Sequence, residues 1–265
     1  MRQSRLFAIV VAGAFLLPAL LVAQGRGAQQ PPKNLQVLPR DMPRNQVTAL
    51  MRTFAMALGV RCEHCHTEDP NAPAPAAGRA GRGGRGGPPL DYALDDKETK
   101  KVAREMLKMV MDINGKYLPT TGRTIDEFNR VTCETCHHGL ARPQTLRSAM
   151  ALAVNGGGAD SAIALYRQLR TRYYGSGAYD FTELTLNETG GQIAANPDQR
   201  TSAIALLKLN LEFFPRSVPT IFTLANVSVQ AGDTAGAVEA LNKGLEIEPN
   251  NNQLRNLLQR IKPGG

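Results

Sequence analysis

The chain has 265 residues, a formal net charge of +8 at pH 7, 5% aromatic residues and no tryptophan. So few aromatic side chains exclude a core built mainly on aromatic packing. Arg2 and Arg5 stand at the extreme N-terminus and three more arginines lie in one glycine-rich run, so the basic balance is weak support for a polyanion-binding face. No stretch mixes basic and aromatic residues, and we therefore expect no nucleic-acid partner.

The first 24 residues have the pattern of a secretory signal peptide. A basic start precedes an unbroken apolar run over 6–22 and small residues at 23–25. The run is close to the shortest length that spans a bilayer, so an uncleaved membrane anchor is the alternative. Pro18 and the small residues that follow favour cleavage. We expect a periplasmic or otherwise exported protein, which is membrane-associated if the segment is retained.

A polar linker is expected over 25–44, followed by a helix over 45–59. Its apolar residues recur at helical spacing, and Gly59 suits its end. Met56 is about 140° from Met51 around the axis and points away from the apolar face. The stretch "VRCEHCH" follows directly at 60–66. The apolar face comprises Val47, Met51, Phe54, Ala55 and Leu58.

Residues 69–89 are rich in Gly, Pro, Ala and Arg, a composition that predicts a flexible solvated loop. A second helix is expected from Asp95 to Tyr117, because Asp95 and Glu98 resemble a capping box and an acidic first turn suits the helix dipole. A turn-rich connection then leads to "VTCETCHHG" at 131–139. The apolar face of this helix comprises Val102, Ala103, Met106, Met109, Val110, Ile113 and Tyr117.

The two Cys-x-x-Cys-His motifs contain every cysteine of the chain. A redox disulfide would need a βαβ context, which the chain lacks. A single zinc held by both pairs would need closer spacing than that between Cys65 and Cys133. Covalent haem attachment uses both cysteines of each motif and the adjacent histidine, and it fits export. We predict two covalent haem c groups, attached through Cys62, Cys65, Cys133 and Cys136, with His66 and His137 as iron ligands.

Haem also compensates for the scarcity of aromatic side chains, since two apolar macrocycles supply a core for the module at 45–147. Each iron then needs a sixth ligand or a reason to lack one. His64 and His138 are the remaining histidines, and each is held inside or beside a motif, away from its own distal face. Methionine is the available alternative, although a methionine on an apolar helix face is usually core packing.

Three stretches carry a family resemblance: "VTALMRTFAMALGVRCEHCH", "KKVAREMLKMVMDIN" and "VTCETCHHG". Over residues 38–143 they resemble the cytochrome subunit of photosynthetic reaction centres. The resemblance implies Met51 as sixth ligand of the first haem and Met106 as that of the second, with Met109 as a close rival on the same face. Well-known members bind four haems, whereas this chain has attachment motifs for two, which favours a stand-alone two-haem relative.

The remainder of the chain is expected to be a linker over 148–159, containing "NGGG", and helical repeats over 160–262. A period with Ala-x-x-x-Leu and a closing Pro resembles the tetratricopeptide repeat over 184–251. Flanking helices are expected to complete the short stack, which we interpret as a docking or structural module. The pairs that lie 34 residues apart are Ala203 and Ala237, Leu207 and Leu241, and Pro215 and Pro249.

Together these features predict an all-α protein, with a small haem-packed helical c-type cytochrome module before a repeat tail. We expect electron transfer with redox partner proteins, membrane-bound ones included, rather than enzymatic catalysis, because two His/Met irons leave no open site. One alternative is a dihaem peroxidase or reductase with one open iron. The other is a repeat scaffold whose haems are structural.

Overall fold

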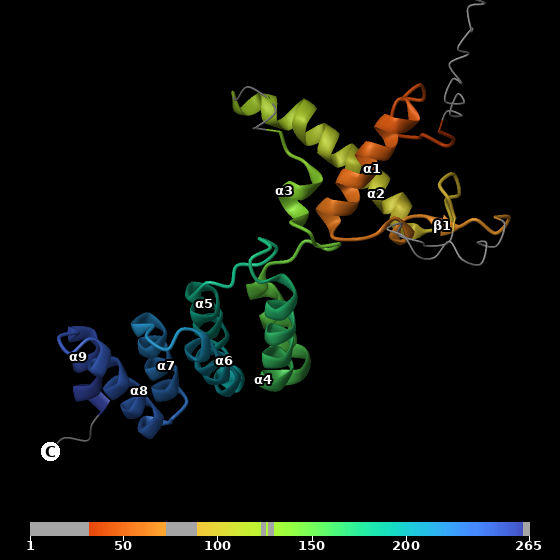
Figure 1. The fold of residues 1–265 in the computed structure, drawn as a ribbon. Helices are drawn as coiled ribbons and strands as arrows, with labels where there is room; N and C mark the ends of the chain where they lie inside the picture. The colour runs from red at the N-terminus through yellow and green to blue at the C-terminus, as the bar shows by residue number, and fades with distance from the viewer. Residues whose placement is uncertain (1–31, 73–88, 123–125, 127–129, 262–265) are drawn as a thin grey trace, which may run out of the picture.

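The computed structural model describes residues 32–72, 89–122, 126 and 130–261. Within those ranges the fold has nine α-helices and a single pair of two-residue strands, which confirms the all-α prediction (Figure 1). None of the described helices is long and apolar enough to cross a membrane. The expected signal peptide and most of the expected loop at 69–89 lie outside the described residues.

The first two helices agree with the sequence pattern, except at the start and end of the second. Helix α1 (Arg44–Leu58) ends at Gly59, which has the left-handed conformation (φ 63°) that favours glycine. Helix α2 (Glu98–Asp112) begins later than expected, and no side chain caps it. The predicted capping box is wrong because Asp95 forms ion pairs instead. After α2 the chain widens into a single π-helical turn, η2 (Ile113–Tyr117), where the sequence pattern predicted continuous α-helix.

Two short strands return the chain to the first motif. Strand β1 (Thr67–Glu68) pairs antiparallel with β2 (Leu90–Asp91). This pairing brings the residues before α2 next to those that follow the first motif. The ladder therefore places the N-terminal end of α2 beside the first Cys-x-x-Cys-His.

The C-terminal half is a stack of helices in which successive members pack on one another (Figure 1). The stack comprises α4 (Leu146–Tyr173), α5 (Glu183–Ile193), α6 (Arg200–Phe213), α7 (Val218–Gln230), α8 (Thr234–Ile247) and α9 (Asn252–Ile261).

The stretch at 148–159, expected to be a linker, is helical. It forms the first half of α4, and the chain departs from helical geometry only at Gly158, whose φ of 71° requires glycine. Leu146, Met150 and Val154 are buried in the same core cluster as the later helices. Packing against α5 and α6 therefore overrides the low helix propensity of the glycines.

The 34-residue period has a counterpart in the packing of the tail. Ala203 in α6 and Ala237 in α8 are both 0% exposed, and so are Leu207 and Leu241. Equivalent positions therefore face the core of the stack. This agreement supports a repeated helical unit, in which α9 covers the last apolar face with Leu254.

Candidate haem-attachment sites

The first motif follows α1 directly. A short 3-10 turn, η1 (Cys62–His64), begins at its first cysteine. The backbone N–H of Cys65 donates to the Cys62 carbonyl at 3.2 Å, and that of His66 donates to the same carbonyl at 3.0 Å. These two bonds hold both cysteines and the histidine in one compact loop, the arrangement that attachment to a single haem requires.

Residues at the start of α2 support this loop from the other side. The Thr99 hydroxyl donates to the His64 carbonyl at 2.6 Å, and the Lys97 ammonium donates to the Glu63 carbonyl. The Tyr92 ring meets the His66 imidazole edge-on, with centroids 5.0 Å apart. The backbone of the first motif is thus fixed against α2.

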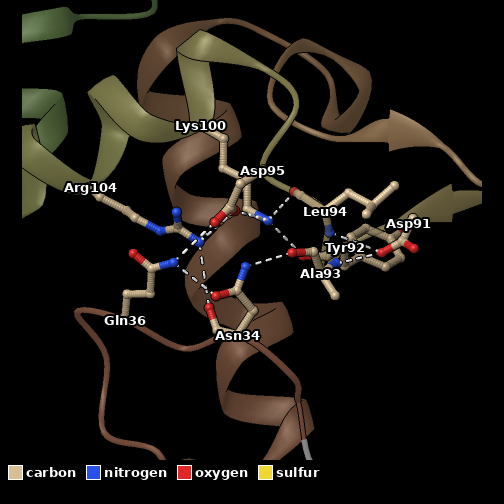
Figure 2. A network of polar contacts seen from close by, with 9 residues as sticks. All are labelled: Asn34, Gln36, Asp91, Tyr92, Ala93, Leu94, Asp95, Lys100 and Arg104. Carbon is tan, nitrogen blue, oxygen red and sulfur yellow. Dashed lines mark hydrogen bonds and ion pairs between the residues drawn. The ribbon is translucent and has the colours of Figure 1, made fainter.

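A polar network fixes this end of α2 to the N-terminal segment (Figure 2). Asp95 pairs with Lys100 at 3.0 Å and with Arg104 at 2.8 Å. The Asn34 amide donates to the carbonyl of Ala93 at 2.6 Å. The Arg104 guanidinium holds the pKa of the Asp95 carboxyl well below its usual range, with the hydrogen bond of Asn34 as a second cause. The carboxylate is therefore ionised at neutral pH.

The second motif forms the short helix α3 (Cys133–His137). The side chains of Thr132 and Thr135 form a capping box at its start. His138 ends α3 with a left-handed backbone conformation. The chain then turns back, and the Leu140 N–H donates to the His137 carbonyl at 2.8 Å. The His137 Nδ1–H donates to the Leu140 carbonyl at 2.8 Å, which leaves Nε2 as the free ligand nitrogen.

Asn114, in the π-turn after α2, ties the second motif to that helix. Its side-chain amide donates to the Val131 carbonyl at 2.7 Å, and its Oδ1 accepts from the Val131 N–H at 2.9 Å. The same amide also donates to the Val110 carbonyl at 2.9 Å. Val131 lies two residues before Cys133. The pair of hydrogen bonds between Asn114 and Val131 therefore sets the position of the second motif relative to α2.

Helix α1, which precedes the first motif, packs against α3 of the second motif. The start of α2, which precedes the second motif, supports the first. The Gly139 N–H donates to the Ala57 carbonyl at 2.8 Å. A Cβ on Gly59 would lie 2.0 Å from the Gly139 carbonyl oxygen, so only glycine allows this approach. The two motifs thus share one small helical frame.

Cys65 and Cys133 are partly buried, whereas Cys62 and Cys136 are exposed. Burial raises the pKa of Cys65 and also that of Cys133. Redox-active Cys-x-x-Cys pairs have the opposite property, a lowered thiol pKa. Burial, followed by the nearby Lys100, lowers the pKa of His66, which keeps the imidazole in the neutral form that binds a metal.

The geometry also argues against a shared zinc site. Over the ranges that the structure describes, no group of three or more His, Cys, Asp or Glu side chains is placed to hold one metal ion. In particular, Cys65 and Cys133 are not brought together in such a group.

Apolar side chains beside the motifs fit a large apolar group. On α2, Val102 is 48% exposed, Met106 41% and Met109 46%, which is unusual for neighbouring large side chains on one helix face. An apolar macrocycle attached to nearby cysteines would cover such a row. The residues present therefore fit haem through both the donor set and the apolar lining.

The remaining predicted residues have less decisive positions. Met51 is partly buried on α1, whereas Met56 and Met111 are exposed. Met56 and His138 line a shallow groove with Tyr173 of α4. His138 therefore faces the tail.

Asn114 and Leu140 were not identified from the sequence. Asn114 acts through backbone atoms 17 residues away, and Leu140 acts through its carbonyl. Neither contact leaves a residue-type signature. A valine stands two positions before each motif, at Val60 and Val131, but among the described residues only Val131 is bonded by a distant side chain.

A helical fold with two Cys-x-x-Cys-His loops defines a candidate c-type cytochrome. Residues 85–188 match the family model described as photosynthetic reaction centre cytochrome C subunit. The match contains α2, the second motif and α4, and it points to covalently bound haem and haem-based electron transfer. It does not reach the first motif at 62–66. No curated protein sequence matches the chain.

Proposed function

We propose that this chain is an exported dihaem c-type cytochrome that transfers electrons between partner proteins. The observation that carries the proposal is a pair of Cys-x-x-Cys-His loops on one small helical frame, in which α2 exposes a row of apolar side chains at Val102, Met106 and Met109. Cys62 and Cys65 would attach one haem, and Cys133 and Cys136 the other. The bound haem would supply the one-electron chemistry.

His66 and His137 would bind iron on the proximal side. The Leu140 carbonyl fixes the tautomer and ring orientation of His137, as second-sphere partners of metal-bound histidines generally do. Burial lowers the pKa of His66, so protonation does not compete with iron for this imidazole at neutral pH.

Met51 and Met106 are the proposed sixth ligands. Met51 lies eight positions before Gly59, where the chain leaves α1 toward the first motif. Met106 lies eight positions before Asn114, which anchors the second motif. Three positions after Met51, α1 has Phe54, whereas three positions after Met106, α2 has Met109. This correspondence favours Met106 over its rival.

The proposal is tested on protein matured in a host that attaches haem. Mass spectrometry of the denatured protein should show two haem additions. Cys62→Ala and Cys136→Ala should each lower the haem count or destabilise the fold. A zinc-loaded, haem-free product from the same host would refute the proposal.

The sixth ligands need a separate experiment. Met106→Ala should open one iron, giving a high-spin spectrum and carbon monoxide binding, while the matched variant Met109→Ala should leave ligation intact. The reverse result would assign Met109. If both irons of the unmodified protein bind carbon monoxide rapidly, the dihaem peroxidase or reductase becomes the better interpretation.

The helical tail is proposed as a docking module of tetratricopeptide-repeat type. Its support is the shared burial of positions 34 residues apart, such as Leu207 and Leu241. The expected partners are redox proteins, and capture of a redox partner by the full chain but not by a chain that stops at Thr145 would support this role. Equal capture by both chains would instead locate docking on the motif-bearing region.

A further inference from the structure

The two proximal histidines have different surroundings. The His137 Nδ1–H donates to a backbone carbonyl at 2.8 Å. The Nδ1 of His66 is buried and has no hydrogen-bond partner within the described ranges. A hydrogen bond from this position increases the electron donation of the imidazole to iron, which stabilises the oxidised metal. His137 has that bond and His66 lacks it.

The charges around the first motif also favour the reduced state of an iron bound to His66. Lys97, Lys100 and Arg104 all act on His66, whereas Asp91 opposes them. Asp95 neutralises part of this charge through its pairs with Lys100 and Arg104 (Figure 2). These three cations and the two carboxylates, of Asp91 and Asp95, leave an excess of one positive charge beside the imidazole. Lys100 is only 8% exposed, so water screens its charge poorly.

The acidic residue inside each motif adds a second charge difference. Glu63 lies between the cysteines of the first motif and pairs with Arg61 at 2.9 Å. Glu134 occupies the equivalent position of the second motif, and no ion pair of its carboxylate is found in the part of the chain that the structure describes. Among the described residues, no cation lies within ion-pair distance of this negative charge at the second motif.

We propose that these residues set unequal potentials, with Lys97, Lys100 and Arg104 making the haem site at His66 the more readily reduced. The His137–Leu140 bond and Glu134 hold the site at His137 lower. The inference rests on the proposed attachment of two haems. Its physical basis is that oxidised iron carries one more positive charge than reduced iron, so nearby cations disfavour the oxidised form and nearby anions favour it.

The test is a redox titration of the full-length, two-haem protein, followed by visible spectra. Two components of different potential are expected. Lys97→Gln removes one charge at an accessible position and should lower the higher component alone, while Lys97→Arg should leave it in place. Glu134→Gln should raise the lower component alone. Lys208→Gln, an exposed position on α6, is the matched control and should move neither.

Two results would overturn the inference: a single shared potential, or a Lys97→Gln shift confined to the lower component. Mass spectrometry on the same samples separates these results from failure of the proposed function. Two haems with unshifted components refute only the assignment of potentials. Fewer than two haems in the unmodified protein refutes the dihaem proposal itself.

Discussion

The region that carries the motifs, residues 32–145, and the tail, residues 146–261, are built in different ways. Of the buried apolar residues that the structure describes, all but Ala57 and Leu140 belong to one core cluster that begins at Leu146. Both regions are helical, yet only the tail buries its apolar side chains against one another. Helix formation alone therefore does not provide a core.

The difference in burial is a difference in the source of stability. A fully buried Leu, Ile or Val contributes about 1.5–3 kcal/mol relative to an exposed one, and the tail has many such residues. The motif-bearing region relies instead on hydrogen bonds, such as Asn114 to Val131, and on the ion pairs of Asp95. A typical intramolecular hydrogen bond contributes only about 1 kcal/mol, so we expect this region to depend on bound haem for its stability.

The largest expected effect follows from withholding haem. In protein produced without haem attachment, residues 32–145 should lose protection against proteolysis and amide exchange, because their apolar faces lack a partner. The tail should remain protected, since its core needs no cofactor. Exchange measured by mass spectrometry, peptide by peptide, reports both regions at once.

The matched control is the same measurement on the two-haem protein, where both regions should be protected. Equal protection of residues 32–145 with and without haem would contradict the proposed dependence. Loss of protection in the tail on haem removal would show that the two regions fold as one unit.

The next effect concerns the packing between α5 and α6. Leu207→Ala should cost about 2–5 kcal/mol of unfolding free energy through the cavity it leaves. Gly190→Ala should cost about 1–3 kcal/mol, because its Cβ would lie 2.6 Å from the Leu207 Cγ. The double variant should be more stable than the sum of the two losses predicts, because each change relieves the other. Urea denaturation gives all three values.

Gly191→Ala provides the neighbouring control. Its Cβ would meet only the Thr223 Cγ2, at an ordinary distance of 3.7 Å, so alanine should be neutral or slightly stabilising in the helix. Haem spectra should be unchanged in every tail variant. Strict additivity of Leu207→Ala and Gly190→Ala would contradict the described contact.

A smaller effect is expected at Asn114. Asn114→Ala removes both hydrogen bonds to Val131 and leaves its two partly buried backbone groups without these partners, at a cost of about 1–3 kcal/mol. Because the second motif is then no longer fixed to α2, the fraction of that haem with a methionine ligand should fall and carbon monoxide binding should appear. Visible spectra measure both changes.

Asn226 offers a matched substitution, since its amide donates to the Phe222 carbonyl within α7 and touches no motif. Asn226→Ala should leave both haem spectra unchanged. If Asn114→Ala also preserves ligation and haem count, the anchor is dispensable, and another contact sets the position of the second motif.

The sequence predicted the parts of this fold that depend on local pattern. The helical class, the end of α1 at Gly59 and the burial of positions 34 residues apart all follow from periodicity and residue type. The attachment motifs could be recognised for the same reason, because adjacent residues supply the whole donor set.

Features that depend on distant partners were missed. Asp95 matched a capping box in the sequence, but its carboxylate is taken by Arg104 and Lys100, and α2 begins uncapped. The glycines at 155–158 indicated a linker, but packing of Leu146 and Met150 on the tail core makes that stretch helical. Local preference was overridden by tertiary contacts in both places.

The smallest effect tests the ion pairs of the motif-bearing region through pH. The pKa of Asp95 is lowered in the folded protein, first by Arg104 and then by Asn34. A group with a lowered folded pKa contributes stability above its unfolded pKa, about 3.9 for Asp, and loses that contribution as pH falls toward the folded value. The stability difference between the parent and Asp95→Asn should therefore be constant from neutral pH to about pH 5 and shrink below about pH 4.

The adjacent substitution Asp96→Asn is the control, because the Asp96 side chain is exposed and no ion pair of it is found within the described residues. It should change stability little at any pH, since isolated surface charges contribute about 0–1 kcal/mol. Thermal unfolding, followed by haem absorbance for the motif-bearing region and by circular dichroism for the whole chain, gives the comparison. A difference for Asp95→Asn that persists unchanged at pH 3 would show that the side-chain amide, rather than the lost charge, causes the effect. A loss confined to the dichroism signal would place the damage in the tail, where the structure puts no contact of Asp95.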